Sequence, residues 1–113
     1  MSDATWDPTV AERETRGSVA ELVAESGLAS GTPITLDLRF VPGSDADRPG
    51  FIAAMRAAGY AGAAYEAGGR EELEASLPQI PLTPDAVWAE EARAAEIALA
   101  HGYEPAGWGF EEP

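Results

Sequence analysis

The residue types in this chain of 113 residues offer few starting points for catalytic or metal chemistry. The absence of cysteine excludes disulfides, thiolate nucleophiles and thiolate metal sites. On the expected helix, Ile97 rather than a carboxylate stands four residues before the single histidine, His101. A metal site or a serine–histidine pair would both depend on His101. The sequence therefore predicts no metal site, no catalytic residue and no cofactor.

Carboxylates are the abundant chemical group. Twenty Asp and Glu stand against seven basic residues, which gives a net charge of −13 and a pI near 4.2. Two convergent carboxylates could perform acid–base chemistry, but the acidic runs fall at the edges of expected elements, as is typical of solvated surface. The charge argues against binding nucleic acid or anionic membrane directly, because both need clustered cations. It favours a protein partner with an Arg-rich, basic surface.

We expect such a partner to contact the acidic runs and the last aromatic residue of the chain. Repulsion among many like charges opposes compactness, so these groups favour electrostatically steered, salt-sensitive association rather than stability. The predicted partner-binding residues are Glu71, Glu72, Glu74, Glu90, Glu104, Phe110, Glu111 and Glu112.

Capping signals and hydropathy period predict the elements that position these residues. Asp7-Pro8 and Thr83-Pro84 each pair a capping side chain with a proline at the first helical position. Apolar and polar residues alternate over 34–41, the period of a strand with one buried face. The expected helices are 7–26, 47–58 and 83–100, and the expected strands are 34–41, 60–66, 73–82 and 103–110.

Some side chains predict finer details. Pro78 and Pro81 are incompatible with a central strand, so the strand 73–82 is expected at an edge or to end early. Trp108, between Gly107 and Gly109, is expected to plug the core, and the alternative is an exposed contact residue. Trp6 is expected to fasten the first helix to the body. The predicted inward face of the last helix is Trp88, Ala92, Ala95 and Leu99.

The element order predicts an α+β chain. An N-terminal helix and linker (1–31) precede a strand–helix–strand–strand–helix–strand unit (32–113). That order is typical of a ferredoxin-like sandwich, an antiparallel sheet with two helices on one face. The first residues lack the basic flank and apolar run of a signal peptide, and no segment has the roughly 20 apolar residues needed to cross a bilayer, so we expect a cytoplasmic protein.

The C-terminal stretch resembles the closing motif of the regulator of ribonuclease activity B family. That motif is a helix, a His-Gly stop and a strand written roughly Glu-Tyr-Asp-Gly-Trp-Gly. Glu104 and the run Gly107-Trp108-Gly109 match it, while Pro105 and Ala106 stand where the family has Tyr and Asp. The order of elements and the segment Glu14-Thr15-Arg16 are similar as well.

The resemblance implies a ferredoxin-like domain with no catalytic centre, which binds ribonuclease E or an RNA-degradation assembly and inhibits it. The run 107–109 would then be structural. Three alternatives remain from the residues alone: a small-molecule-binding domain, an enzyme that uses a carboxylate pair, or an acidic protein that mimics the charge of nucleic acid. A convergent cavity with two buried carboxylates would favour the enzyme, and a flat acidic face would favour the regulator.

Overall fold

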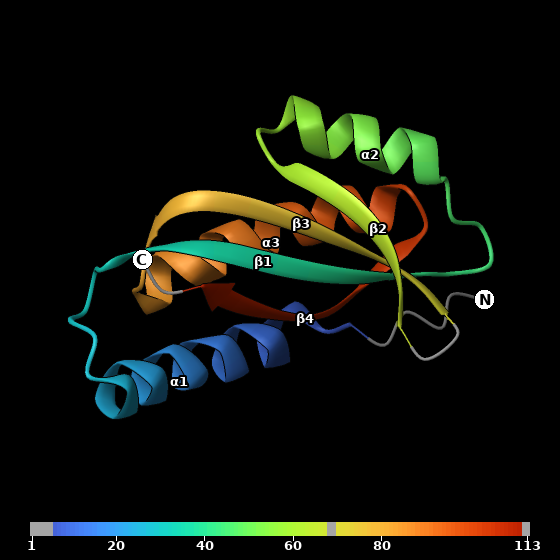
Figure 1. Cartoon of the computed structure of the whole chain (residues 1–113). Helices are drawn as coiled ribbons and strands as arrows, with labels where there is room; N and C mark the ends of the chain where they lie inside the picture. Colours follow the sequence, from blue (N-terminus) through green and yellow to red (C-terminus); the bar gives the residue numbers. More distant parts are fainter. Residues whose placement is uncertain (1–5, 68–69, 112–113) are drawn as a thin grey trace.

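The structure, a computed structural model, describes residues 6–67 and 70–111, without the side chains of 62–71 and 111 (Figure 1). The chain is α+β, as predicted. Its elements in order are α1 (Pro8–Ser26), β1 (Pro33–Pro42), α2 (Arg48–Ala57), β2 (Ala61–Ala67), β3 (Arg70–Pro81), α3 (Pro84–Ala100) and β4 (Tyr103–Glu111).

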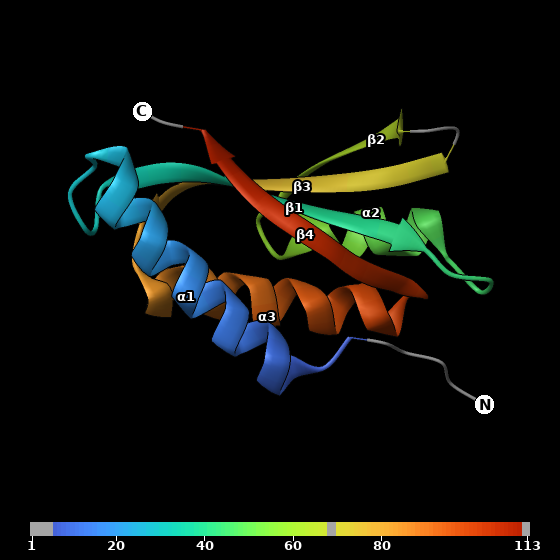
Figure 2. The same ribbon diagram turned by 90° about the horizontal axis from the view of Figure 1, so that it is seen from below.

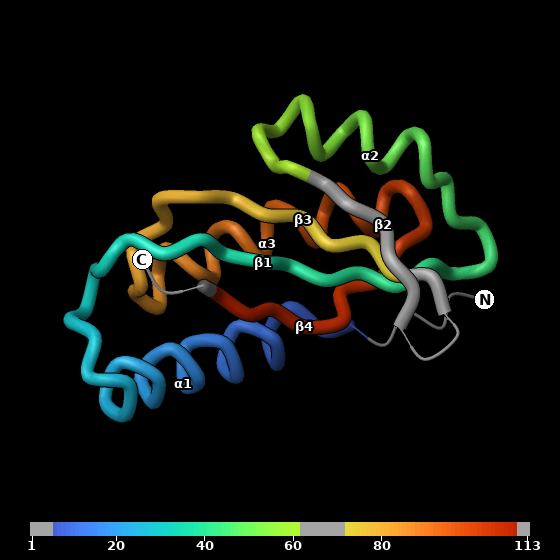
Figure 3. The backbone as a smooth tube through the Cα atoms, viewed as in Figure 1, coloured from blue at the N-terminus to red at the C-terminus, as the bar shows by residue number. Residues whose placement is uncertain are grey.

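The strands form one antiparallel sheet in the order β2-β3-β1-β4. All three helices lie on one side of this sheet (Figure 2), and α1 packs against α3. The smooth trace in Figure 3 shows that α1 and β4, far apart in the sequence, lie side by side. None of the described helices is both long and apolar enough to cross a membrane.

The helices begin and end where the capping signals predict. Asp7 accepts hydrogen bonds from the N–H groups of Thr9 and Val10, at 2.9 and 3.4 Å, and Gly27 ends α1 in the left-handed conformation with φ 78°. Thr83 caps α3 through the N–H of Ala86 at 3.1 Å. These side chains satisfy amides that the first helical turn leaves unpaired, which is why the boundaries are readable from sequence.

The core lies between the sheet and the helices. The predicted alternation of β1 is confirmed: Leu36, Leu38 and Phe40 are buried on the helix side. From α2, Phe51 inserts between two aromatic rings. Its centroid is 5.2 Å from Phe40, edge to face, and 4.5 Å from Tyr103, stacked. Burial of these side chains is the main stabilising contribution of the core.

The expectation that β3 lies at an edge is wrong for its first half. Residues 73–76 are central, with β2 on one side and β1 on the other. Ala61, the first residue of β2, is opposite Ser76, so β3 beyond Ser76 pairs with β1 alone. Pro78 therefore falls where one side of β3 has no strand, beside a register shift that also includes Gln79 at φ 63°. β3 tolerates Pro78 and Pro81 because β2 does not extend alongside this part of the strand.

The predicted inward face of α3 is also wrong in part. The buried residues are Val87, Ala94, Ala95 and Ala98, while Leu99 is 39% exposed. Small side chains let α3 approach both the sheet and α1 closely, so the alanines occupy the contact and the larger residues lie beside it. Trp88 is half-buried rather than in the core.

Trp6 fastens the start of the chain to α3. Its ring stacks on Trp88 with centroids 6.3 Å apart and an interplanar angle of 20°. This contact is the attachment predicted for Trp6, and it covers a side chain that α3 leaves outside the core.

Candidate functional site

Helix α1 is fixed to α3. Val19 is fully buried. The Thr15 hydroxyl donates a hydrogen bond to the Glu91 carboxylate, and Arg16 pairs with Asp85 at 2.6 Å. Because the hydrogen bond and the ion pair attach α1 to α3 and not to β4, a groove remains between α1 and β4.

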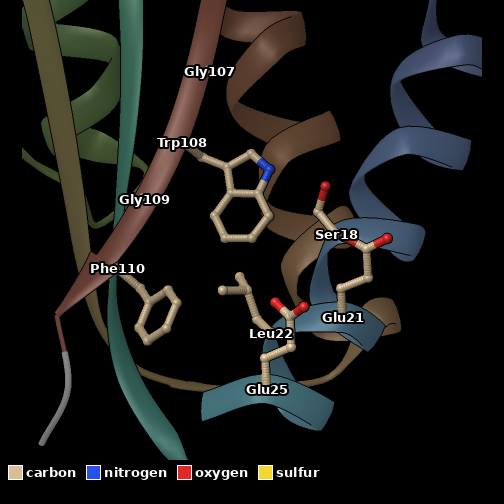
Figure 4. Close-up of a pocket in the computed structure, with 8 residues that line it drawn as sticks. All are labelled: Ser18, Glu21, Leu22, Glu25, Gly107, Trp108, Gly109 and Phe110. Atoms are coloured by element: carbon tan, nitrogen blue, oxygen red, sulfur yellow. The ribbon is translucent and has the colours of Figure 1, made fainter.

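The groove has a volume of about 590 Å³ and two walls of different chemistry. Figure 4 shows the rings of Trp108 and Phe110 reaching from β4 toward α1, with Leu22 between them and the helix. Its lining residues are Ser18, Glu21, Leu22 and Glu25 from α1, and Gly107, Trp108, Gly109 and Phe110 from β4.

A second hollow of about 290 Å³ continues the groove toward the starts of α1 and β4. The two share Ser18, Gly107 and Trp108. The further lining residues of the second hollow are Trp6, Ala11, Glu14, Thr15, Glu91 and Pro105. Together they form a trough along α1 and β4, which we call the α1–β4 groove.

Trp108 is not the buried plug that the sequence predicts. Its register partner is Leu38, and that of Phe110 is Leu36, so both rings lie on the helix side of the sheet. Both are partly buried and pack against the core. They keep exposed surface because α1 packs against α3 and does not cover them. The expectation is corrected: Trp108 belongs to the core boundary and to the wall of a groove.

The groove is acidic. Its lining includes Glu14, Glu21, Glu25 and Glu91, and no Arg or His is among the residues that line either hollow. Glu21 and Glu25 are exposed at its rim. Burial raises the pKa of Glu91, the hydrogen bond from Thr15 opposes this, and the charge of Glu14 adds to it. The groove is therefore suited to a cationic, partly apolar ligand.

Exchanging Glu91→Gln should raise the thermal midpoint at pH 7 and leave it nearly unchanged near pH 4. A carboxyl group with a higher pKa in the folded than in the unfolded state binds its proton more tightly when folded. The free energy of unfolding therefore decreases as the pH rises from the unfolded pKa through the folded pKa. Gln still accepts from Thr15 but carries no charge. Thermal unfolding of both proteins from pH 4 to pH 8 measures the difference, which should grow with pH. A larger loss for Gln at pH 7 than at pH 4 would contradict this expectation.

The predicted partner-binding residues do not form one surface. Glu72 and Glu74 alternate with buried Leu73 and Ala75, which places them on the open face of the sheet, away from the groove.

The remaining predicted residues also scatter. Glu90 accepts from Tyr60 at 2.8 Å and pairs with Arg93 at 2.6 Å, and Glu104 lies near the start of β4. Phe110 is the predicted residue that lines the groove. Glu112 lies outside the described residues, and the side chains of Glu71 and Glu111 are not described.

Sequence reasoning missed the α1 wall of the groove. Ser18, Glu21, Leu22 and Glu25 recur at spacings of three and four, which places them on one face of a helix. This spacing predicts that the four residues share a face. The sequence does not predict that this face is turned toward β4, because its orientation follows from the attachment of α1 to α3.

In the described part of the chain, no three His, Asp or Glu side chains gather as metal ligands would. His101 forms the C-cap of α3, and its Nδ1 lies 3.7 Å from Asp47 Oδ2. Its ring is tilted on Phe51 with centroids 6.4 Å apart. His101 thus belongs to the C-terminal end of α3 and lines neither hollow of the groove.

Exchanging His101→Ala should leave partner binding within about twofold of the unaltered protein, because His101 lines neither hollow of the groove. Affinity measured for both proteins under the same conditions checks this. Stoichiometric zinc or iron on the purified protein, lost in the variant, would contradict it.

Comparison with protein-family models and with curated proteins finds no match to this chain.

Proposed function

We propose that this protein is a non-catalytic, acidic regulator that binds a basic segment of a protein partner in the α1–β4 groove. The observation that carries the proposal is the pairing of aromatic rings on the β4 wall with carboxylates on the α1 wall. An arginine can stack its guanidinium on an indole while pairing with carboxylates, and it is less strongly hydrated than lysine. Arg-rich segments therefore fit both walls together.

The architecture supports a ferredoxin-like assignment. After α1, the elements follow the order strand, helix, strand, strand, helix, strand, and the antiparallel sheet has β1 and β3 at its centre. The resemblance to the regulator of ribonuclease activity B family rests on Gly107, Trp108 and Gly109, and these residues line the groove. The same segment thus supports both the family resemblance and the binding role.

We propose ribonuclease E, or an assembly that contains it, as the partner, and inhibition by contact in the cytoplasm as the outcome. The non-catalytic regions of such nucleases are rich in arginine, which complements a chain of charge −13. A carboxylate enzyme would need two buried carboxylates converging in a cavity. The two hollows of the groove contain one partly buried carboxylate, Glu91, which is held by Thr15, and this favours the regulator.

Titration of the protein into an RNA-cleavage reaction of purified ribonuclease E tests the proposal. We expect a saturable decrease in cleavage rate that parallels binding. Ribonuclease E without its Arg-rich non-catalytic region is the control, and its cleavage rate should not change. Absence of binding to the full enzyme at low salt would overturn the choice of partner, and equal inhibition of both forms would overturn the binding mode.

A further inference from the structure

β4 is an edge strand whose outer side has no partner strand. The sheet order places β1 on one side of β4 and no strand on the other. Every second residue of such a strand directs its N–H and C=O away from the sheet. Among the backbone hydrogen bonds outside helices and strands in the described ranges, none reaches residues 105–110. No such bond therefore occupies the outer N–H and C=O groups of this part of β4.

The second half of β4 has no proline, bulge or lysine, three features that often blunt an edge, and its one charged residue is the terminal Glu111. The first half has Pro105 and a register shift opposite Arg39 and Phe40. Gly107 next to this shift has a positive φ of 121°, and from Trp108 to Glu111 β4 pairs residue for residue with β1. At about 3.4 Å per residue, this regular edge is about 14 Å long. It is long enough to template a short added strand.

Glycine at position 109 leaves room beside this edge. A Cβ added at Gly109 would meet no atom within 4 Å, and its φ is not positive. Neither crowding nor backbone conformation within the described chain therefore requires glycine there. Inside a strand, glycine is destabilising relative to alanine, and it is common where another backbone approaches closely.

We propose that the partner segment binds as an extended strand added to the free edge of β4, with arginines at alternate positions turned into the α1–β4 groove. This inference rests on the proposed function and specifies its geometry. Side chains of a strand alternate between the two faces of a sheet, so every second side chain of the added strand lies on the helix side. There it meets the rings of Trp108 and Phe110 and the exposed carboxylates of Glu21 and Glu25.

Synthetic peptides test the geometry. The probe is a capped peptide of three Arg-Thr repeats, compared with a peptide of identical composition whose arginines are contiguous. Two further versions of the alternating peptide have N-methyl groups on the amides of all arginines or of all threonines. Because alternate N–H groups of an added strand face β4, one methylated version should lose at least about 20-fold in affinity and the other less than about threefold. The contiguous peptide should bind at least about fivefold more weakly than the alternating one.

Hydrogen exchange of the β4 amides is the second measurement. On binding of the alternating peptide, every second amide from 107 to 110 should become protected, while Trp108→Phe should keep this pattern. Equal affinity of both methylated versions, with no protection of β4, would overturn strand addition and leave groove binding and ribonuclease E inhibition standing. Failure of the alternating peptide to bind would also overturn strand addition, and the ribonuclease E titration then decides the function separately. Protection of β4 without peptide that depends on protein concentration would assign the edge to a second copy of this chain.

Discussion

The variant Trp108→Ala should lose at least about 30-fold in affinity for the basic partner while remaining folded. A large aromatic ring in a groove is the kind of contact that contributes about 2 kcal/mol or more to binding, and 1.4 kcal/mol is a factor of ten. Because Trp108 is partly exposed, its loss should cost about 1–2 kcal/mol of stability, less than the roughly 3–5 kcal/mol of a fully buried tryptophan. Calorimetric titration with ribonuclease E and thermal unfolding measure the two quantities.

Two control variants separate these effects. Trp108→Phe keeps an aromatic ring on the β4 wall and should lose less than about fivefold in affinity. Leu99→Ala removes an exposed apolar side chain that does not line the groove, and should leave affinity unchanged. A stability loss in the range of a buried tryptophan, with unchanged affinity of the folded Trp108→Ala protein, would restore the core-plug role and remove Trp108 from the binding site.

The double variant Glu21→Gln with Glu25→Gln should lower the association rate about fivefold to tenfold at low salt. Both carboxylates are exposed at the rim of the groove, where they attract a basic segment before contact. The Debye length is about 8 Å at physiological ionic strength, so this attraction should weaken steeply as salt rises. Stopped-flow association with ribonuclease E between about 0.02 and 0.3 M NaCl measures how the association rate depends on the two carboxylates and on salt.

A matched control has the same change in net charge away from the groove. Asp45→Asn with Glu96→Gln also removes two exposed carboxylates, and neither residue lines the hollows. Its association rate should stay within about twofold of that of the unaltered protein. Equal slowing by both double variants would assign steering to the net charge of −13 rather than to the groove. A rate that does not change with salt would contradict electrostatic steering altogether.

Composition alone leads us to expect electrostatic steering, but it does not locate the acidic groove. Acidic runs such as Glu71-Glu72 stand out in the sequence because their members are adjacent, whereas Glu21 and Glu25 are separated by three residues. Adjacent strand residues point to opposite faces, so a run on a strand is split between two surfaces. Helical residues four apart share one face, and this is why the α1 carboxylates line the same groove.

Local signals were sufficient for the helix boundaries and the buried face of β1. Asp7, Thr83 and Gly27 act on their own neighbours in the chain, and the alternation of Leu36 and Leu38 needs no knowledge of distant residues. Tertiary structure decided the central place of β3, the alanine face of α3 and the partial exposure of Trp108. Each depends on which other element lies alongside. Pairing of β3 with β2 stops at Ser76, before Pro78, α3 packs closely through alanine, and α1 docks on α3 through Thr15 and Arg16 rather than over β4. The groove exists because α1 and β4 do not pack against each other, and the distance between them is set by the contacts of α1 with α3.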